Sequence, residues 1–458
     1  MKIARVLAVL LGCATVAVAQ EAPAVEVKPA GDARIVEATL PGHVLGVAAT
    51  GDGRRLAILT MTDPEALRTV FVLDPRGEAE LTKTMVELPS ASLAIAGLPS
   101  GTVVVGEPGK IFSLGPSAAG PVKLLLESPH LDLSFLERRG MLQTAGIFQP
   151  LVGRLLVFRP DDQEILAVAD EIALPLEVGR ERRGLRLESP PVTVLGRPGG
   201  LPPDSPPLVL VGPVARGNTR LLTTWIDDKT RACGDEECEQ SRQRWSRLPA
   251  PEIVTESFYV DVDGRATLVV ATVAADKVGV FERKQLRVFP LWSDRTRAGA
   301  AATLKAETTS RRWQEVEIEV LDLGGDGRDD LAVLQRDGLG GKKVVVEVYT
   351  GTGNGGFYTA SRQTAVTAPD AVWRYGRDAD GDRQPDLVVL AEGRLLIFPG
   401  VDHKRLVVAK KPRWTFEPPA STTFGDLQLV DLGGDGRYQI VVWSAADGHT
   451  WLRVIELG

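Results

Sequence analysis

An acidic, glycine-rich motif that runs directly into an apolar stretch recurs along the second half of the chain. It reads "VLDLGGDGRDDLAVL" from Val320 and returns, in weaker forms, as "YVDVDGRATLVV", "YGRDADGDRQPDLVVL" and "LVDLGGDGRYQIVVW". The first aspartates of these motifs are Asp261, Asp322, Asp378 and Asp431, at spacings of 61, 56 and 53 residues. A motif that recurs at nearly constant intervals predicts that the chain consists of similar structural units in series.

Short polar or proline-containing breaks divide the whole chain at similar intervals. They lie at residues 39–42, 87–90, 127–130, 188–191, 247–251, 308–312, 367–370 and 417–420. Between two such breaks, residues 92–128 contain four β-rich stretches separated by glycine or proline, and no convincing amphipathic helix is found. Serial four-stranded units predict an all-β protein, a β-propeller of eight four-stranded blades, with seven blades as the alternative.

The two ends of the chain complement each other in this prediction. After the last break the chain has only three strand-like stretches before Gly458, whereas residues 33–42 form a surplus strand before the first full unit. We expect residues 33–42 to pair with residues 451–457 and complete the last blade, so that no long sheet edge stays open. The predicted organisation is therefore a signal peptide (1–19), a flexible segment (20–32) and one propeller domain (33–458), with repeats around 259–285, 317–357, 373–399 and 427–457.

The first twenty residues are typical of an export signal. A basic start at Lys2 and Arg5 precedes an apolar run that ends in a small-x-small triplet at Ala19. The run is shorter than the roughly 20 residues that a membrane-spanning helix needs, and no later stretch is long enough. We expect a periplasmic or secreted protein; in the alternative, "LLGC" is a lipobox and a lipid on Cys13 anchors the protein to a membrane.

Export would also place the cysteines in an oxidising compartment, where a disulfide can form. If Cys13 is removed with the signal, the remaining pair is Cys233 and Cys238 in "RACGDEECEQ", which favours a disulfide that closes a small loop. Two cysteines without a nearby histidine make a poor zinc site, and their spacing differs from that of a redox Cys-x-x-Cys motif.

The densest of the acidic motifs has the composition of a cation site. Asp378, Asp380, Asp382 and Asp386 can converge on one point, and the backbone carbonyl of Gln384 can add a neutral oxygen. Hard oxygen ligands of this kind suit calcium, at about 2.3–2.6 Å per ligand. Without a cation the carboxylates would repel one another, so we expect structural Ca²⁺; a plain acidic turn is the alternative.

These motifs resemble the FG-GAP or VCBS-type repeats of integrin-α-like propellers, and "GTGNGGF" at 351–357 resembles the later glycine-rich turn of that family. The family pattern is Asp-x-Asp/Asn-x-Asp/Asn-Gly-x-x-Asp-Leu, and its loop between the first two strands of a blade binds calcium. The resemblance covers roughly the last 200 residues. It implies a calcium-stabilised propeller and specifies no particular function.

By position, the resemblance implies two sets of metal ligands. They are Asp378, Asp380, Asp382, Gln384 and Asp386 in one loop, and Asp322, Asp326, Arg328 and Asp330 in another. The sequence departs from the pattern at Arg383, which replaces a glycine, and at Gly324, which lacks the second ligand. Gln439 replaces the last acid of the Asp431 loop, and the segment holding Asp261 and Asp263 is too short to repeat the pattern. We therefore expect calcium affinity to fall from the Asp378 loop to the Asp322 loop and then to the Asp431 loop.

The net charge and the absence of recognisable catalytic motifs limit the classes of function that the sequence supports. With 53 basic and 60 acidic residues, the net charge of -7 gives no electrostatic reason to expect a nucleic acid as partner. The four histidines, His43, His130, His403 and His449, lie in no recognisable catalytic motif. All eight tryptophans lie between Trp225 and Trp451, either as core residues or as platforms for sugar rings.

Two classes of function remain open. The first is an exported, non-catalytic propeller that serves as a scaffold for a protein or glycan ligand. The second is an extracytoplasmic enzyme, a polysaccharide lyase or glycoside hydrolase that uses the channel mouth. Glycosidic hydrolysis needs two carboxylic acids at a defined separation in one cleft. Acidic clusters that recur blade by blade are better explained by structure, which favours the scaffold.

Overall fold

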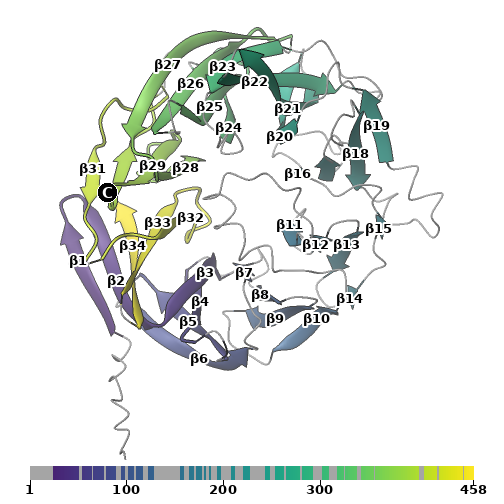
Figure 1. Cartoon of the computed structure of the whole chain (residues 1–458). Helices are drawn as coiled ribbons and strands as arrows, with labels where there is room; N and C mark the ends of the chain where they lie inside the picture. Colours follow the sequence, from purple (N-terminus) through teal and green to yellow (C-terminus); the bar gives the residue numbers. More distant parts are fainter. Residues whose placement is uncertain are drawn as a thin grey trace, which may run out of the picture.

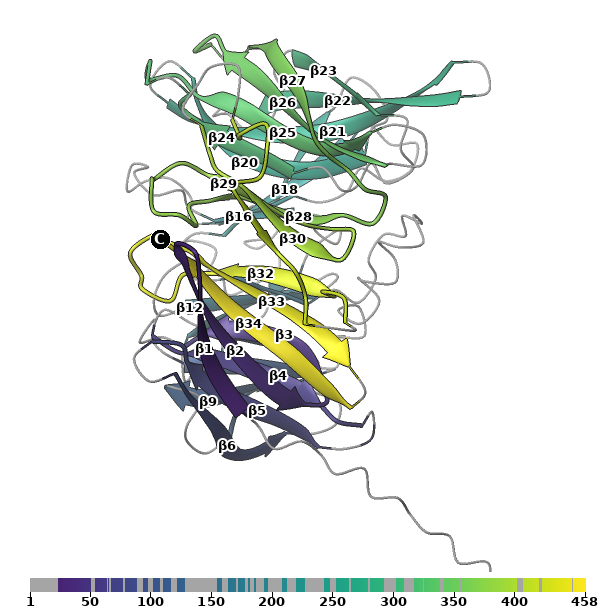
Figure 2. The same cartoon turned by 90° about the vertical axis from the view of Figure 1, so that its left-hand side faces the viewer.

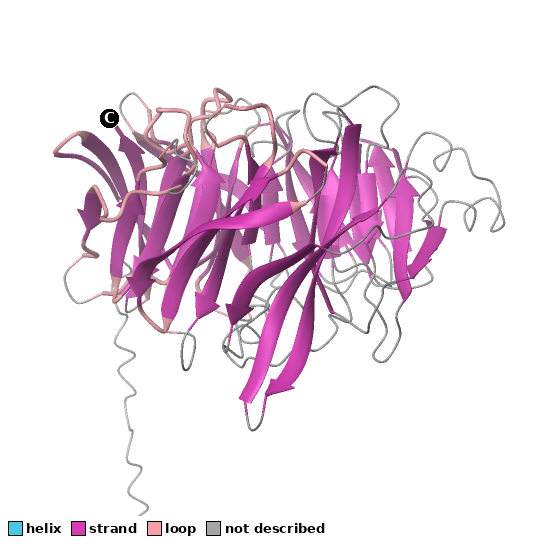
Figure 3. Cartoon of the chain, turned by 90° about the horizontal axis from the view of Figure 1, so that it is seen from above, coloured by secondary structure: helices cyan, strands magenta, loops and turns pink. Residues whose placement is uncertain are grey.

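The computed structural model describes these residues: 24–50, 54–63, 65, 67–76, 79–88, 94–97, 102–107, 110–116, 122–127, 155–158, 164–169, 172–177, 180–181, 185–186, 193–196, 208–211, 220–226, 243–247, 253–262, 265–278, 281–291, 302–308, 317–323, 325–337, 342–354, 356–401, 407–419, 422–446 and 448–458. They form strands, turns and bends, and no helix occurs among them. Figure 3 shows the same all-β content from above. The predictions of a signal peptide, of lipidation at Cys13 and of the Cys233–Cys238 disulfide concern residues outside these ranges.

The strands of the first half are β1 (Ala24–Ala30), β2 (Ala33–Pro41), β3 (His43–Ala49), β4 (Leu56–Met61), β5 (Arg68–Asp74), β6 (Glu80–Leu88), β7 (Ala94–Gly97), β8 (Thr102–Glu107), β9 (Lys110–Pro116), β10 (Lys123–Glu127), β11 (Leu155–Phe158), β12 (Glu164–Ala169), β13 (Ile172–Glu177), β14 (Arg180–Glu181), β15 (Leu185–Arg186), β16 (Thr193–Gly196), β17 (Leu208–Val211) and β18 (Arg220–Ile226).

The strands of the second half are β19 (Gln243–Arg247), β20 (Ile253–Val262), β21 (Arg265–Val278), β22 (Phe281–Leu291), β23 (Ala302–Thr308), β24 (Glu317–Leu321), β25 (Asp330–Asp337), β26 (Lys343–Gly351), β27 (Phe357–Thr367), β28 (Val372–Arg377), β29 (Asp386–Ala391), β30 (Arg394–Phe398), β31 (Trp414–Phe416), β32 (Asp426–Val430), β33 (Gln439–Ala446) and β34 (His449–Leu457).

Within the described ranges these strands form eight antiparallel sheets, most of them four-stranded and in simple chain order. The sheets are β3–β6, β7–β10, β11–β15, β16–β19, β20–β23, β24–β27, β28–β31 and the five-stranded β1-β2-β34-β33-β32. Seven of these sheets are each built from one unit predicted between the sequence breaks, and the closing sheet adds β1 and β2 to the last unit. Figure 1 shows them arranged in a ring, with the first strand of each four-stranded sheet toward the centre and the last toward the rim; in the closing sheet β32 lies toward the centre and β1 at the rim. This is the architecture of a β-propeller.

The apolar core lies between neighbouring sheets. One cluster lies between the sheets β24–β27 and β28–β31, and a second lies between β28–β31 and the closing sheet β1-β2-β34-β33-β32. A third cluster lies between this closing sheet and β3–β6, and a fourth lies between β3–β6 and β7–β10. Strands in the middle of a sheet are therefore covered on both faces. This explains why β29 is buried along its whole length, whereas the outer strand β27 is half-buried or exposed.

The N-terminal strand β2 lies between β1 and the C-terminal strand β34 (Figure 2). The register runs from Ala33 opposite Leu457 to Pro41 opposite His449, which is the pairing expected from the sequence. Alternate side chains enter different clusters: Ile35 packs toward β28–β31, and Val36 packs toward β3–β6. Residues 24–30 differ from the expected flexible segment, because they form β1 and pair with β2 over seven residues.

The structure also describes some of the tryptophan and histidine side chains that the sequence singles out. Trp373 and Trp414 are buried in the inter-sheet clusters, so that these two are core residues, the first of the two alternatives for the tryptophans. Trp443 and Trp451 are half-buried. The other four tryptophans lie outside the residues whose side chains are described. His43 is exposed, and His449 makes an edge-to-face contact with Trp451. Among the described residues, no helix has the length and apolar character needed to cross a membrane.

Candidate functional site

The three clearest acidic motifs form equivalent loops, each between the first two strands of a sheet. The Asp322 loop joins β24 to β25, the Asp378 loop joins β28 to β29, and the Asp431 loop joins β32 to β33. Asp261, in contrast, lies within β20 and pairs with Ala266 of β21, so that only two residues connect these strands. This agrees with the expectation that this fourth segment is too short to repeat the pattern.

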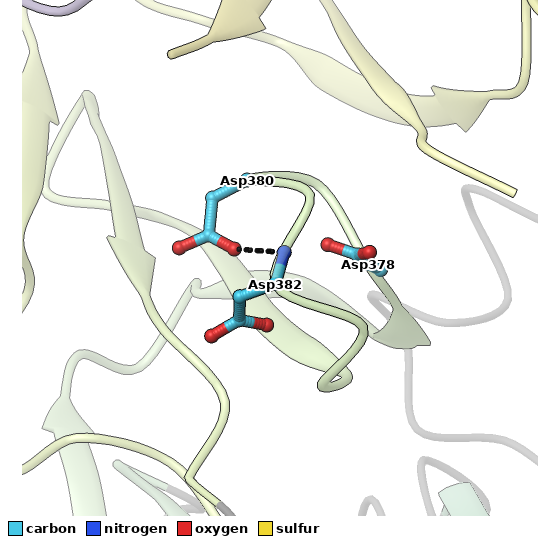
Figure 4. A group of neighbouring side chains, drawn as sticks. All are labelled: Asp378, Asp380 and Asp382. Carbon is cyan, nitrogen blue, oxygen red and sulfur yellow. Dashed lines mark hydrogen bonds between the residues drawn. The ribbon is translucent and has the colours of Figure 1, made fainter.

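The Asp378 loop brings three carboxylates together. Oxygen atoms of Asp378, Asp380 and Asp382 all lie within 4.8 Å of one another (Figure 4). The loop holds them there through hydrogen bonds to its own backbone. Asp380 accepts the N–H of Asp382 at 3.2 Å, and Asp382 accepts the N–H of Gln384 at 2.7 Å.

Asp378 closes the same turn. One of its carboxylate oxygens accepts the N–H of Gly381 at 2.6 Å, and the other accepts the N–H of Arg383 at 2.8 Å. The chain folds back tightly here, and Gly381 has a φ of 87°, a left-handed value that residues with a Cβ rarely adopt. Arg383 has a φ of 70°, which explains why the family pattern has a glycine at its position.

Asp386, the fourth predicted carboxylate of this loop, lies outside the group of three. It is fully buried at the start of β29, where Oδ2 accepts the N–H groups of Ala379 at 2.7 Å and Asp380 at 3.2 Å. Oδ1 accepts the N–H of Gly400, just after β30, at 2.8 Å. Asp386 therefore ties the loop to the end of the third strand of its sheet. Burial raises the pKa of its carboxyl to about 7, against the lowering effect of the amides that it accepts.

The Asp322 loop repeats this design with fewer acids. Asp322 accepts the N–H groups of Asp326 at 3.0 Å and Gly327 at 3.1 Å, and Asp326 accepts the N–H of Arg328 at 3.2 Å. Asp322, Asp326 and Arg328 are all exposed.

Asp330 has the same position as Asp386 and makes the same contacts. It is buried and accepts the N–H groups of Leu323 at 3.1 Å and Gly351 at 2.8 Å. At Gly351 an added Cβ would lie 2.0 Å from the backbone oxygen of Asp329, so only glycine allows the end of β26 to approach the loop this closely.

The Asp431 loop has no aspartate at the position of Asp386 and Asp330, yet it keeps the hydrogen bond that this side chain makes to the loop backbone. Asp431 accepts the N–H groups of Gly434 at 2.6 Å and Gly436 at 3.0 Å. Gln439 replaces the aspartate, and its side-chain oxygen accepts the N–H of Leu432 at 2.8 Å. An uncharged amide therefore performs this part of the role that Asp386 and Asp330 have in the other two loops.

The electrostatics of the Asp378 loop fit a cation. Burial raises the pKa of Asp380, and the nearby charges of Asp382 and Asp378 raise it further. The positive charge of Arg413 partly offsets this rise in the pKa of Asp380, because its Nη1 lies 3.8 Å from a carboxylate oxygen of Asp380. Three converging carboxylates would supply part of the six to eight oxygen ligands that Ca²⁺ takes, and a backbone carbonyl and water could complete the set.

A cleft of about 650 Å³ lies between the Asp378 loop and the Asp431 loop. Its lining residues are Leu321, Gly376, Arg377, Asp378, Gly381, Arg383, Gln384, Pro385, Asp435, Gly436, Arg437 and Tyr438. The two loops are joined at the backbone, where Asp378 and Arg437 form a parallel bridge and the N–H of Tyr438 donates to the carbonyl of Asp378 at 2.7 Å. Neighbouring sheets thus present one continuous surface here.

Glu317 and Glu319 on β24 form a second pair of acids, which the sequence motifs do not single out. Both residues are half-buried and lie against β28. Burial together with the charge of Glu319 raises the pKa of Glu317 to about 7, partly offset by Arg374. The Glu319 carboxyl lies against Gly376, whose missing Cβ would be 2.4 Å from Glu319 Cδ. The signal in the sequence is the alternation "EVEIEV", which places two acids on one face of a strand.

No family model and no curated protein matches this chain. Among solved structures, the WD40 domain of SCAP from fission yeast is similar with a TM-score of 0.47 and 12% identity, covering 96% of this chain and 98% of that chain. BBS1N in complex with ARL6DN, soaked with lead, matches with a TM-score of 0.30 and 13% identity, covering 66% of this chain and 90% of that chain. Both TM-scores are low, so the assignment to the β-propellers depends on the strand order described above.

Proposed function

We propose that this protein is an exported, non-catalytic β-propeller that serves as a protein-binding scaffold, with blade loops stabilised by calcium. The observation that carries the proposal is the junction of the Asp378 and Asp431 loops over the cleft. A scaffold needs loops held in one conformation, because ordering loops on binding costs affinity. The hydrogen bond from Tyr438 to Asp378 links loops of two different sheets in this way.

The blade count of eight and the closure of the ring belong to this proposal. They are supported by the eight sheets among the described residues and by the nine-residue ladder between β2 and β34. A β1 strand outside β2 makes the closing sheet wider than its neighbours.

We also propose that the Asp378 loop binds calcium and that the repeats are of the FG-GAP/VCBS type. Support comes from the three converging carboxylates of the Asp378 loop and from the equivalent positions of the three loops. Asp386 would act on the metal site indirectly, by holding the loop, because it is fully buried and lies outside the group of three converging carboxylates, and the buried Asp330 has the equivalent position in its loop. Calcium would neutralise the mutual repulsion of Asp378, Asp380 and Asp382.

Export follows from the N-terminal sequence, with cleavage after Ala19 or, in the alternative, lipidation of Cys13. An oxidising compartment would allow the Cys233–Cys238 disulfide. Mass spectrometry of protein purified from its native compartment tests all three points. Two free thiols, or an intact N-terminus at Met1, would contradict the proposal.

The scaffold function is tested by photo-crosslinking in the native cells. A photoreactive residue at the exposed position 383 lies at the cleft, and the same residue at position 417, which is exposed on another surface, is the matched control. We expect one recurrent protein partner from position 383 and none of it from position 417. Absence of any protein adduct from position 383 would contradict a protein-binding role for this surface.

The second candidate is an extracytoplasmic polysaccharide lyase or glycoside hydrolase. It is favoured by Glu317 and Glu319, a pair of half-buried acids with raised pKa beside the cleft residue Gly376. Incubation of the purified protein with a panel of acidic and neutral polysaccharides, followed by assays for reducing ends and for unsaturated uronates, distinguishes the candidates. Turnover that Glu317→Gln abolishes would establish the enzyme and overturn the non-catalytic scaffold.

A further inference from the structure

The cleft between the Asp378 and Asp431 loops is lined by three arginines and two aspartates, in a protein that is acidic as a whole. Its lining contains the three arginines Arg377, Arg383 and Arg437. Within the described part of the chain, none of the three guanidinium groups forms an ion pair with a carboxylate. This is unusual, because other arginines of the same region, Arg362 and Arg413 among them, are paired.

Arg437 has unmet hydrogen-bonding capacity. Its Nε and Nη2 atoms are buried and have no acceptor, and the guanidinium packs against Gly381 of the neighbouring loop. Leaving a buried donor without a partner costs free energy, so an acceptor entering the cleft would be favoured once rotation of the side chain presents these N–H groups to it.

The two acids of the cleft lining do not supply that acceptor. Asp378 uses both carboxylate oxygens for backbone N–H groups of its own loop. Asp435 accepts the backbone N–H of Arg437 at 3.1 Å. The charge of Arg377 acts on the nearby carboxyl of Glu319 and partly offsets the rise of its pKa. The buried Nε and Nη2 of Arg437 have no carboxylate partner among the described residues.

We propose that this cleft binds the carboxylates of an acidic peptide segment in a partner protein. A guanidinium matches a carboxylate in a bidentate geometry, and arginine clusters are a recurring means of binding acidic motifs. The volume of about 650 Å³ lies within the range of ligand sites. The proposal rests on the proposed scaffold function and names the chemistry of its partner.

The lining favours a peptide over an acidic sugar. A sugar ring needs an open aromatic face, and the single aromatic residue of this lining, Tyr438, has the Arg377 guanidinium 5.4 Å from its ring centroid. Leu321 and Pro385 add apolar surface beside the arginines, which suits side chains that flank an acidic residue.

The test measures binding of a fluorescein-labelled hexaglutamate peptide to the full chain by fluorescence anisotropy at low ionic strength. Hexaglutamine is the matched neutral peptide, trigalacturonate represents a glycan carboxylate, and inorganic phosphate represents a free anion. The variants are Arg437→Gln and Arg377→Gln. Arg394→Gln is the control, because Arg394 pairs with Glu392 at 3.0 Å and does not line the cleft. Thermal melts establish that each variant is folded.

We expect hexaglutamate to bind at least about tenfold more tightly than hexaglutamine, and each cleft variant to lose about tenfold or more, the loss of one charge-assisted hydrogen bond. Arg394→Gln should bind like the wild type. Equal binding by folded cleft variants, tighter binding of trigalacturonate, or full competition by phosphate at equal concentration would each overturn the peptide proposal. If Arg437→Gln still captures the same partner by crosslinking, the scaffold function stands and the cleft assignment fails.

Discussion

The side-chain oxygen of Gln439 accepts the backbone N–H of Leu432 at 2.8 Å, the same contact that the carboxylate of Asp330 makes with Leu323 at 3.1 Å. A neutral amide and a carboxylate thus perform the same task in equivalent loops of two sheets. The task needs an acceptor oxygen at the start of the second strand, and it does not need a charge.

Asp330→Ala should therefore be far more destabilising than Asp330→Asn. Alanine leaves the buried N–H groups of Leu323 and Gly351 without an acceptor, at a cost of about 2–4 kcal/mol, whereas asparagine keeps one acceptor oxygen and should lose less than half as much. Urea denaturation followed by tryptophan fluorescence measures both. Equal losses for the two variants would show that the charge of Asp330 is required.

Calcium should raise the melting temperature, and the Asp378 loop should account for most of the effect. At a free calcium concentration 100 times Kd, binding to the folded state adds about 2.7 kcal/mol of stability, which corresponds to a shift of a few degrees. Asp382→Asn removes one of three converging carboxylates and should abolish most of this shift, whereas Asp326→Asn, in the loop with fewer acids, should leave it nearly intact. Melting curves that superimpose in calcium and in chelator would identify the loops as plain acidic turns.

Glu317 should make the protein less stable as the pH rises toward neutrality. Its pKa is about 7 in the folded state, above the ordinary value of 4.5, because the carboxyl is buried beside Glu319. The folded state therefore holds the proton more tightly, and this stabilising contribution is complete below about pH 4.5 and lost as the pH rises through 7.

Glu317→Gln should remove that dependence. Relative to the wild type, the variant should gain at most about 3 kcal/mol at pH 8 and nothing at pH 4, as measured by urea denaturation across this range. Glu417→Gln, at an exposed position, is the control and should track the wild type. A constant difference between Glu317→Gln and the wild type at all pH values would refute the assignment.

Removal of β2 should be far more damaging than removal of β1. Deletion of residues 20–31 takes away an outer strand that is largely exposed, whereas deletion of residues 20–42 also removes the strand between β1 and β34. The longer deletion exposes the edge of β34 and the clusters that Ile35 and Val36 fill, so we expect a markedly lower melting temperature and binding of a hydrophobic dye. Similar melting temperatures for the two deletions would mean that β2 contributes little to holding the ends together.

The order of strands was predictable from the sequence because it depends on local signals. Glycine and proline breaks end strands, and apolar runs between them form strands, so the units and the surplus N-terminal strand could be found without tertiary information. The pairing of residues 33–41 with 449–457 followed from one strand missing at one end and one in excess at the other. The strand at 24–30 was missed because its polar alternation does not distinguish an exposed outer strand from a flexible segment.

The roles of the acids were decided only by the tertiary structure. Asp382 and Asp386 look alike in the motif, yet Asp386 turns inward because the N–H of Gly400, fourteen residues away, needs an acceptor in a buried position. The raised pKa of Glu317 likewise depends on β28, which covers a carboxyl that the sequence alone would leave in solvent.

The cleft between the Asp378 and Asp431 loops likewise depends on the tertiary structure, because two different sheets supply its residues. Arg377 and Arg437 belong to different sheets, and they meet because neighbouring sheets pack side by side and their first loops join at Asp378. Local sequence determines which residues form strands and turns, since backbone preferences act within a few positions. Burial and charge depend on neighbours supplied by other sheets, and these exist only once the ring of sheets has assembled.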